Sequence, residues 1–428
     1  MASAVPPKPR PASATAGSLL RHWGLWLVPA LLSCLVALVL SLLYMGGILD
    51  PTAHLRRLPI ALVDGDTGRP LPGQAQNLGA QLSRSVVEGT PAGHVDWHRV
   101  DRAQAQQQLD SAEIYGALVI PPDFTDSVAA LTTPSATTRP TLTVLTNPGV
   151  GSLGSSIASQ ITQLAAQDAA TAVGRQLSAA AASAGADSTT RLLLSDPIEV
   201  TTAVGHPIGA HSGLGLSAFY YTLLLVLAGF IGGNVIHNGV DTSLGYADSE
   251  IGPWHTRRPT VPIDRTQTLL LKMGMTAGIS LLTTSLVMVA TVAVLGMDAP
   301  HLPLLWLFSY CATLAVGLGV QAINAAFGGI GQIVSMFVFI ALALPSSGAT
   351  VPLQAAPGFY RFLGEFEPMR QLVGGVRAIL YFDARSDAGL SRGWIMIGIG
   401  FVAALVVGFA MAQYYDRKGL RRYTPHPA

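Results

Sequence analysis

The sequence has few charged residues, and almost no lysine. Only 11% of its 428 residues are Asp, Glu, Lys or Arg, whereas soluble proteins average roughly a quarter. Lysine occurs only as Lys8, Lys272 and Lys418, and the net charge is +1. So balanced a charge provides no field that would attract nucleic acid, and we expect no nucleic-acid partner.

Cysteine is also scarce, and no arrangement of metal ligands is evident. Cys34 and Cys311 both lie inside apolar runs, where a thiol packs as a small hydrophobic group. The motif DGDTG at 64–68 lacks the remaining ligands of a calcium loop. It also contains the D-T-G of aspartic proteases, but the sequence has no second such motif. We therefore interpret this motif as a turn, and predict neither a metal nor a cofactor.

Catalytic motifs are absent from the sequence. It contains no phosphate-binding G-x-x-x-x-G-K-[ST] loop, no H-E-x-x-H and no nucleophile elbow. We therefore predict no catalytic residue and no enzyme. If the protein transports a substrate, the energy must come from another subunit or from a gradient.

What the sequence does have is apolar runs, six of which approach the roughly 20 residues that a membrane-spanning helix needs. They comprise residues 23–44, 216–236, 268–295, 304–326, 330–344 and 394–414. A cleaved signal peptide is the alternative for the first run. Its apolar core would be about 7–15 residues long, shorter than this run. Leu42 to Met45 is also a poor cleavage site, so a retained anchor is favoured.

Basic residues predict the orientation, because short cytoplasmic loops are enriched in Lys and Arg. They gather in three places: Lys8, Arg10 and Arg21; Arg257, Arg258 and Arg265; and Arg417, Lys418, Arg421 and Arg422. With six spans, all three groups fall on one side, so we expect both termini to be cytoplasmic. Segment 346–393 would then lie outside despite its five arginines. Lys272 lies near a span end, from which it would snorkel to the interface.

Residues 46–214 alternate between strand and helix patterns, which predicts a small α/β domain. Strands are expected at 57–64, 94–100, 115–120 and 141–145, and helices at 74–87, 102–109 and 152–184. The predicted fold class is an α-helical polytopic membrane protein, with about six transmembrane helices and an extracytoplasmic α/β domain inserted between helices 1 and 2. The expected divisions are a cytoplasmic tail 1–22, helix 23–45, outer domain 46–214, membrane domain 215–416 of about five helices, and basic cytoplasmic tail 417–428.

The order of these parts resembles that of type-2 ABC exporter permeases, and most closely the branch that includes the phage infection proteins. Four segments show the resemblance: LPIALVDGDTG at 58–68, YGALVIPPDF at 115–124, NP at 147–148, and the loop containing Leu244, Arg265 and Lys272. The resemblance implies a permease subunit that moves a hydrophobic or amphipathic substrate out of the cytoplasm. It further implies a separate ATP-binding subunit, a homodimer, and a location in the plasma membrane, here of a bacterium.

Two sets of residues are candidates for that function. The first is a partner-docking loop: Leu244, Arg257, Arg258, Arg265 and Lys272. The second lies in segment 346–393, where apolar residues recur every three or four positions and would form one apolar face from Leu363 to Leu380. This pattern predicts a helix lying in the outer interface or a re-entrant pair lining an exit, and the alternative is an ordinary outer loop. The members of this second set are Leu363, Phe366, Met369, Val373 and Leu380. The alternative function is a surface receptor or secretion scaffold, whose outer domain binds a partner while the helices only anchor it in the lipid.

Polar side chains within the apolar runs are few. Asn234, Gln321, Asn324 and Gln332 are expected to form hydrogen bonds between helices, and the alternative is that they line a substrate path. The motifs Gly229-x-x-x-Gly233 and Gly274-x-x-x-Gly278 would permit close helix contact, although chance matches are common in a chain with 45 glycines.

Overall fold

A computed structural model describes residues 23–71, 74–131, 139–183 and 196–420, together with residues 16, 20, 21, 194 and 422. The chain divides into two units, Met1–Gly46 and Gly47–Ala428. Lys8, Arg10 and Arg421, and with them most of the predicted terminal tails, lie outside the described residues. The first unit is essentially one apolar helix, α2 (Trp23–Gly46), with Pro29 inside it.

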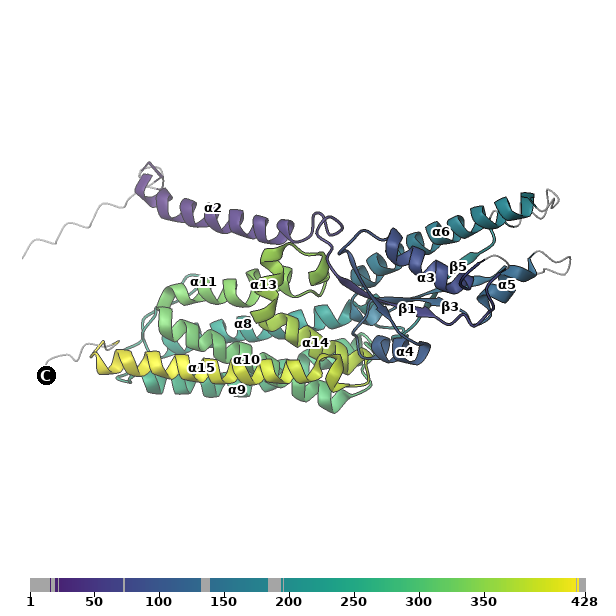
Figure 1. Ribbon diagram of the computed structural model, residues 1–428. Helices are drawn as coiled ribbons and strands as arrows, with labels where there is room; N and C mark the ends of the chain where they lie inside the picture. Colours follow the sequence, from purple (N-terminus) through teal and green to yellow (C-terminus); the bar gives the residue numbers. More distant parts are fainter. Residues whose placement is uncertain are drawn as a thin grey trace, which may run out of the picture. The chain divides into compact units, whose positions relative to one another are not determined.

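The first part of the second unit is a five-stranded mixed sheet with the strand order β2-β1-β3-β4-β5. Figure 1 labels its strands β1, β3 and β5 and the helices beside them. The strands of the sheet are β1 (Leu58–Asp64), β2 (Val95–Arg99), β3 (Gly116–Ile120), β4 (Thr141–Thr146) and β5 (Glu199–Val204). β1 pairs in parallel with β2 and β3, β3 is antiparallel to β4, and β4 is parallel to β5. The central strands β1 and β3 are buried on both faces, which explains why their sequences are almost continuously apolar.

Helices cover both faces of the sheet. They are α3 (Leu78–Gly89), α4 (Arg102–Asp110), α5 (Phe124–Ala130) and α6 (Ser152–Ser183). Helices α3, α5 and α6 pack on the face that contains Leu62 and Leu118, and α4 packs on the opposite face. Helix α6 has few large apolar side chains because it contacts the sheet through alanines such as Ala158, Ala166 and Ala170, which allow a close approach.

From the end of β1 the DGDTG segment is neither helix nor strand, and Asp64 and Asp66 each accept a hydrogen bond from the backbone N–H two residues on, as in the predicted turn. One carboxylate oxygen of Asp66 accepts hydrogen bonds from the backbone N–H groups of Gly68 (3.0 Å) and Thr125 (3.2 Å). The other oxygen accepts from the N–H of Gly79, at 2.9 Å. The carboxylate therefore ties the turn to the starts of α3 and α5, and it acts as a structural group.

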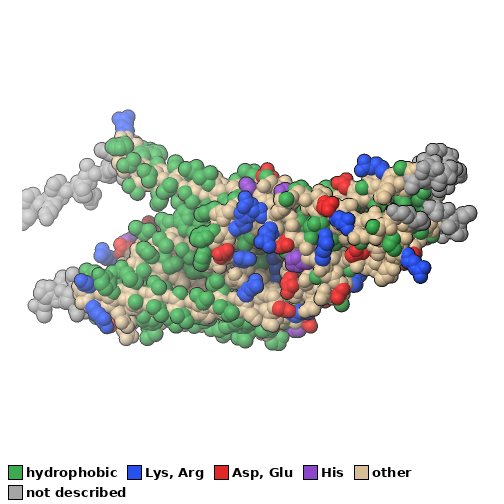
Figure 2. Space-filling model, in the orientation of Figure 1, with side chains coloured by type: hydrophobic (Ala, Val, Ile, Leu, Met, Phe, Trp, Pro, Cys, Tyr) green, Lys and Arg blue, Asp and Glu red, His purple; other side chains and the backbone are tan. Residues whose placement is uncertain are grey.

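The second part of this unit is a helical bundle. Its helices are α8 (Ser217–Ser243), α9 (Arg265–Met288), α10 (Leu302–Phe327), α11 (Gly331–Met336), α12 (Ala343–Ser346), α13 (Gly358–Phe366), α14 (Pro368–Tyr381) and α15 (Ser391–Arg417). π-Helical stretches extend α9 over Val289–Val294, join α11 to α12 over Phe337–Ala341, and precede α15 over Ser386–Leu390. Figure 2 shows hydrophobic side chains covering the helical bundle, whereas charged side chains gather over the sheet.

Five stretches of the described chain are long and apolar enough to cross a membrane, compared with six in the prediction: Trp26–Gly46, Ser217–Ser243, Arg265–Val294, Leu302–Ser346 and Ser386–Arg417. The difference comes from Leu302–Ser346, which contains two predicted spans. The helix breaks there at Gly328, where φ is +63° and ψ is −133°. A Cβ added to Gly319 would meet the ring of Phe339, so the second half runs back along α10.

Helices α8 and α10 touch through the first of the two glycine motifs. A Cβ placed on Gly229 would lie 2.6 Å from the carbonyl oxygen of Thr313, and one on Gly233 would lie 2.9 Å from Val320. Gly274 and Gly278 have nothing within 4 Å of such an atom. Among the described residues, therefore, the first motif forms a close helix contact and the second does not.

The predicted interfacial segment forms two helices, α13 and α14, which separate at Glu367 and Pro368. Proline lacks a backbone N–H and disfavours helical geometry at the residue before it, so the chain cannot continue α13 through this point. The prediction of one apolar face from Leu363 to Leu380 is therefore wrong. Phe366, on α13, has 64% of its surface exposed, whereas Val373, on α14, has 1%.

Helix α14 is one of the best-buried helices of the bundle and packs against α8, α10 and α15. Met369, Val373 and Leu380 are all buried in these contacts. The ring of Phe308, from α10, fills the space left by Gly375 and Gly393. Helix α13 instead presents Phe359, Phe362 and Phe366 on its exposed side.

Glu367, at the junction of α13 and α14, predicts a pH-dependent stability. Burial raises the pKa of its carboxyl from 4.5 to about 8 and outweighs the hydrogen bonds from the backbone of Arg370 and Met369. The folded state therefore holds a proton that the unfolded state releases. This contribution to stability is complete below pH 4.5 and is lost as the pH rises through 8. We expect the melting temperature to fall between about pH 5 and pH 8, with each unit of pKa difference worth about 1.4 kcal/mol.

Glu367→Gln should flatten this fall in a thermal unfolding series, because the amide oxygen still accepts from the N–H of Arg370 but cannot ionise. Glu365→Gln is the matched control, since Glu365 lies two residues earlier and is exposed. If both variants keep the slope of the unmodified protein, Glu367 is not the group that titrates.

Candidate functional site

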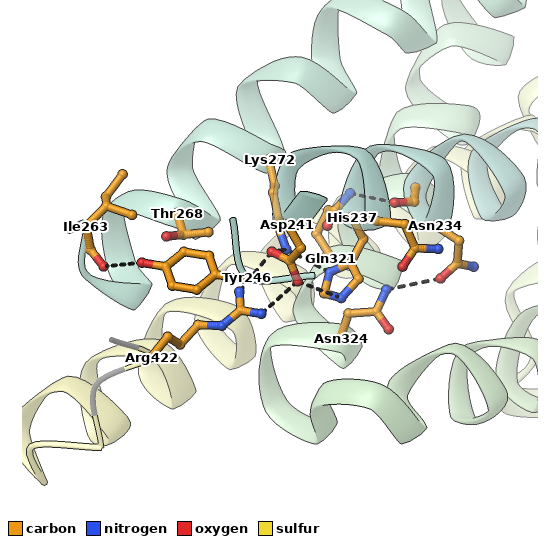
Figure 3. A network of polar contacts seen from close by, with 12 residues as sticks. Asn234, His237, Asp241, Tyr246, Ile263, Thr268, Lys272, Gln321, Asn324 and Arg422 are labelled. Carbon is orange, nitrogen blue, oxygen red and sulfur yellow. Dashed lines mark hydrogen bonds and ion pairs between the residues drawn. The ribbon is translucent and has the colours of Figure 1, made fainter. Parts of the chain in front are cut away.

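A cluster of buried charges lies where α8 ends and α9 begins (Figure 3). Asp241, in the last turn of α8, is its centre. One carboxylate oxygen accepts a hydrogen bond from the ammonium of Lys272, on α9, at 2.7 Å. The guanidinium of Arg422, beyond the end of α15, binds both carboxylate oxygens at 2.8 Å each. The side chains of Asp241 and Lys272 are 9% and 5% exposed, so this is a largely desolvated ion-pair triad.

His237, one helical turn before Asp241, completes the cluster. Its Nδ1 lies 2.9 Å from the Nζ of Lys272, and its Nε2 lies 3.5 Å from a carboxylate oxygen of Asp241. A lysine ammonium can only donate, so Nδ1 accepts and the ring proton lies on Nε2, facing the carboxylate. The side chains of His237, Asp241 and Lys272 thus each contact the other two.

The local sequence explains why these charges pair. A carboxylate at the C-terminal end of a helix is disfavoured by the helix dipole, so Asp241 is stabilised by cations from elsewhere. The start of α9 is the reverse case. Asp264 caps it by accepting from the N–H of Gln267 at 2.6 Å. Asp416, on α15, accepts from the N–H groups of Arg265 and Thr266 at 3.1 and 3.0 Å. Two carboxylates therefore hold the N-terminus of α9 in place.

Amide side chains continue the polar network between α8 and α10. Gln321 donates to the carbonyl of Gly233 at 2.9 Å, and Asn324 donates to the side chain of Asn234 at 3.1 Å. The predicted role of these residues in hydrogen bonding between helices is confirmed. Within the described residues, Gln321 Oε1 and Asn324 Oδ1 are buried without a donor.

A cavity of about 420 Å³ adjoins the cluster. His237, Asp241, Lys272, Gln321 and Asn324 are among the residues that line it. Gln321 and Asn324 therefore bring polar side chains to the cavity wall, although their two unsatisfied oxygens are themselves buried.

The loop between α8 and α9 forms a small exposed hairpin, β6 (Ser249–Ile251) paired with β7 (Trp254–Thr256). Ile251 and Trp254 near its tip are 70% and 73% exposed. At the base, the hydroxyl of Tyr246 donates to the carbonyl of Val261 at 2.7 Å. The guanidinium of Arg422 lies 4.5 Å from the centre of the Tyr246 ring. Arg422 therefore contacts both the base of the hairpin loop and Asp241.

A model of the family described as "Protein of unknown function (DUF3533)" matches residues 28–400, most of the chain. The chain belongs to the DUF3533 family. It is also 27% identical over 129 residues to "Uncharacterized protein YhgE" of Bacillus subtilis (strain 168). That match covers 30% of this chain and 16% of the relative's length. No solved structure matches the chain.

The part of this DUF3533 protein that the family model matches includes Asp241, His237 and Lys272, and it ends before Arg422. The family description states no activity. The predicted relation to type-2 exporter permeases therefore stays a prediction.

The five predicted docking residues of the DUF3533 chain have different surroundings. Arg257 and Arg258 are exposed just after the hairpin, and Leu244 ends α8. Arg265 packs on the C-terminal segment, donating from Nε to the carbonyl of Leu420 at 2.8 Å. Lys272 is 4% exposed, so the prediction that it snorkels to the interface is wrong. It turns inward because Asp241 and His237 offer it partners there.

Asp241, His237 and Arg422 are not among the functional residues predicted from the sequence. A signal for the first two was present, because a histidine and an aspartate four residues apart at the end of an apolar run share one helix face. An aspartate on one span and a lysine on the next are natural partners inside a bilayer. Arg422 gave no such signal, since it lies in a basic tail that topology alone would explain.

Proposed function

We propose that this DUF3533 protein is the membrane subunit of an exporter that moves a hydrophobic or amphipathic substrate out of the cytoplasm. The observation that supports this best is the buried Asp241–Lys272–Arg422 triad beside a cavity. Ionisable groups among membrane helices are costly, and they commonly mark transport pathways or moving parts. Here the triad joins α8, α9 and the C-terminal segment, so breaking it would free these elements to separate.

A separate ATP-binding subunit supplies the energy in this proposal, and it docks on the β6–β7 hairpin. Ile251 and Trp254 offer the apolar contact, with Arg257 and Arg258 beside them. Arg422 stacks on Tyr246 at the base of the hairpin loop and binds Asp241. A displacement of the hairpin would thus disturb the ion pair between Arg422 and Asp241.

In the proposed topology α2, α8, α9, α10 and α15 cross the plasma membrane, and α11 to α12 form the sixth span. The sheet lies outside the cell, and both termini lie in the cytoplasm. The support is the distribution of basic residues, together with the apolar second half of Leu302–Ser346. Two copies would complete one pathway.

The orientation is tested by thiol labelling in a background with Cys34 and Cys311 replaced by serine. Asp168→Cys, on the exposed side of α6, should react with an impermeant reagent in intact cells. Glu250→Cys, in the hairpin, should react only after the membrane is opened. Labelling of the hairpin in intact cells would invert the topology and remove the hairpin from any cytoplasmic partner.

The export function is tested by the double variant Ile251→Ser, Trp254→Ser. We expect normal insertion and melting temperature, because both side chains project into solvent. Co-purification of an ATP-binding subunit and efflux of amphipathic dyes from cells should both be lost. Leu164→Ser is the matched control, since Leu164 is 61% exposed on α6, in the sheet region.

Efflux that does not depend on the protein at all would reject the proposal. In that case the receptor or scaffold alternative makes a separate prediction. A protein partner would be retained by the wild-type chain and by the hairpin variant alike, because the sheet region would bind it.

A further inference from the structure

A second cavity, of about 370 Å³, lies between the sheet and the bundle, where the π-helical stretch Ser386–Leu390 leads into α15. Three arginines line it, namely Arg370 and Arg377 from α14 and Arg392 from the first turn of α15. In the part of the chain that the structure describes, none of the three forms an ion pair. The cavity therefore has an unusual concentration of uncompensated positive charge.

Arg377 is the most telling of the three. One terminal nitrogen donates to the carbonyl oxygen of Ala349 at 2.9 Å. Its Nε is buried and has no hydrogen-bond partner among the described residues. Gly151 lies against the guanidinium, and a Cβ there would come within 2.9 Å of a terminal nitrogen. A buried guanidinium with an unpaired N–H donor costs free energy of folding unless an anion or a hydrogen-bond acceptor pairs with it.

Arg370 likewise donates to a backbone carbonyl and has no ion-pair partner among the described residues. The acceptor is the carbonyl of Gly364, at 3.2 Å. Burial lowers the pKa of both the Arg370 and the Arg377 guanidinium, which reflects the cost of holding charge there. An arginine nevertheless stays protonated, so the charge persists and a counterion would be stabilised.

Two acidic residues also line the cavity, and neither neutralises these arginines. Asp387 is bound by Arg385 through two hydrogen bonds, at 3.0 and 2.7 Å. Glu113 is exposed at the rim. The hydroxyl of Tyr115 donates to the side-chain oxygen of Gln354 at 3.2 Å, and both residues line the cavity.

We propose that this cavity binds a phosphate group, held by Arg370 and Arg377 with Arg392 at the edge. Guanidinium groups present paired N–H donors that match the oxygens of phosphate, and Arg is the usual choice for such sites. The cavity opens where an apolar helix begins, so the phosphate could belong to a lipid headgroup or to a soluble ion. The proposal does not depend on the export function.

The test is isothermal titration of the purified full-length protein in detergent with two probes, inorganic phosphate and a soluble short-chain phosphatidic acid. We expect binding of at least one probe. Binding of the short-chain lipid alone assigns the site to a headgroup, and binding of inorganic phosphate alone assigns it to the free ion. Arg377→Gln and Arg370→Gln should each weaken binding about tenfold or more, because each removes charge-assisted hydrogen bonds.

Two further variants keep the test decisive. Arg392→Gln changes an exposed residue, so weakened binding in that variant cannot be blamed on misfolding. Arg361→Gln removes one positive charge from α13, whose Arg361 does not line the cavity, and it should bind like the wild type. The proposal is overturned if neither probe binds, or if the cavity variants and Arg361→Gln retain equal affinity.

Discussion

Asp241→Asn should destabilise the protein by about 3–5 kcal/mol, the usual cost of removing one partner from a buried ion pair. The substitution keeps the size of the side chain but removes the one carboxylate, among the residues that the structure describes, that pairs with both Lys272 and Arg422. Two cations would then remain in a poorly solvated site with no opposite charge. Thermal unfolding in detergent, and the fraction of monodisperse protein after purification, measure the effect.

Two comparisons separate charge from packing. Asp248→Asn is the matched control, because Asp248 is 49% exposed and pairs only at 3.6 Å with His255 and Arg257. Its loss should change stability by less than about 1 kcal/mol. Adding Lys272→Met to Asp241→Asn should restore part of the loss, since one of the stranded cations is gone. Equal melting temperatures for the Asp241 and Asp248 variants would show that the triad is not stabilising.

Gly229→Leu and Gly233→Leu should each prevent α8 and α10 from packing, and we expect little folded protein from either. At Gly229 the new Cβ would approach the Thr313 carbonyl to 2.6 Å, and a backbone atom cannot rotate away. Overpacking of a core costs about 1–3 kcal/mol where side chains can adjust. Here the helices themselves must separate, which would also break the hydrogen bond from Gln321 to the Gly233 carbonyl.

The chain supplies its own control for this experiment. Gly274→Leu and Gly278→Leu make the same chemical change in the second motif, where a Cβ would meet nothing within 4 Å. They should express and purify as the wild type does. A similar loss in all four variants would point to helix flexibility or insertion as the cause, because propensity changes alike at every position.

The sheet shows how well pattern alone can work. The predicted strands at 57–64, 94–100, 115–120 and 141–145 correspond closely to β1, β2, β3 and β4. Their apolar runs are short, and they are bounded by turn residues or by proline. The strand β5 was missed because it is a largely exposed edge strand without apolar alternation. Its register is fixed by pairing with β4, which is information from elsewhere in the chain.

The bundle shows where the same approach stops. The lengths of the apolar runs predicted the bounds of most long helices to within a few residues. A helix that is buried in lipid or protein is recognisable from its apolar composition alone. The division between α13 and α14 was available from Pro368, but the helical spacing on either side of it concealed the break. The partners of Lys272 depend on how α8 and α9 face each other, which no local pattern specifies.

The glycine contact between α8 and α10 has a consequence for how this family can diverge. Positions 229 and 233 have no room even for a Cβ atom, so natural variation there should be confined to glycine. Positions 274 and 278 have the same residue without the same constraint, and they should drift freely. Two motifs that look identical in one sequence would then be told apart by the history of the family, with only one of them under purifying selection.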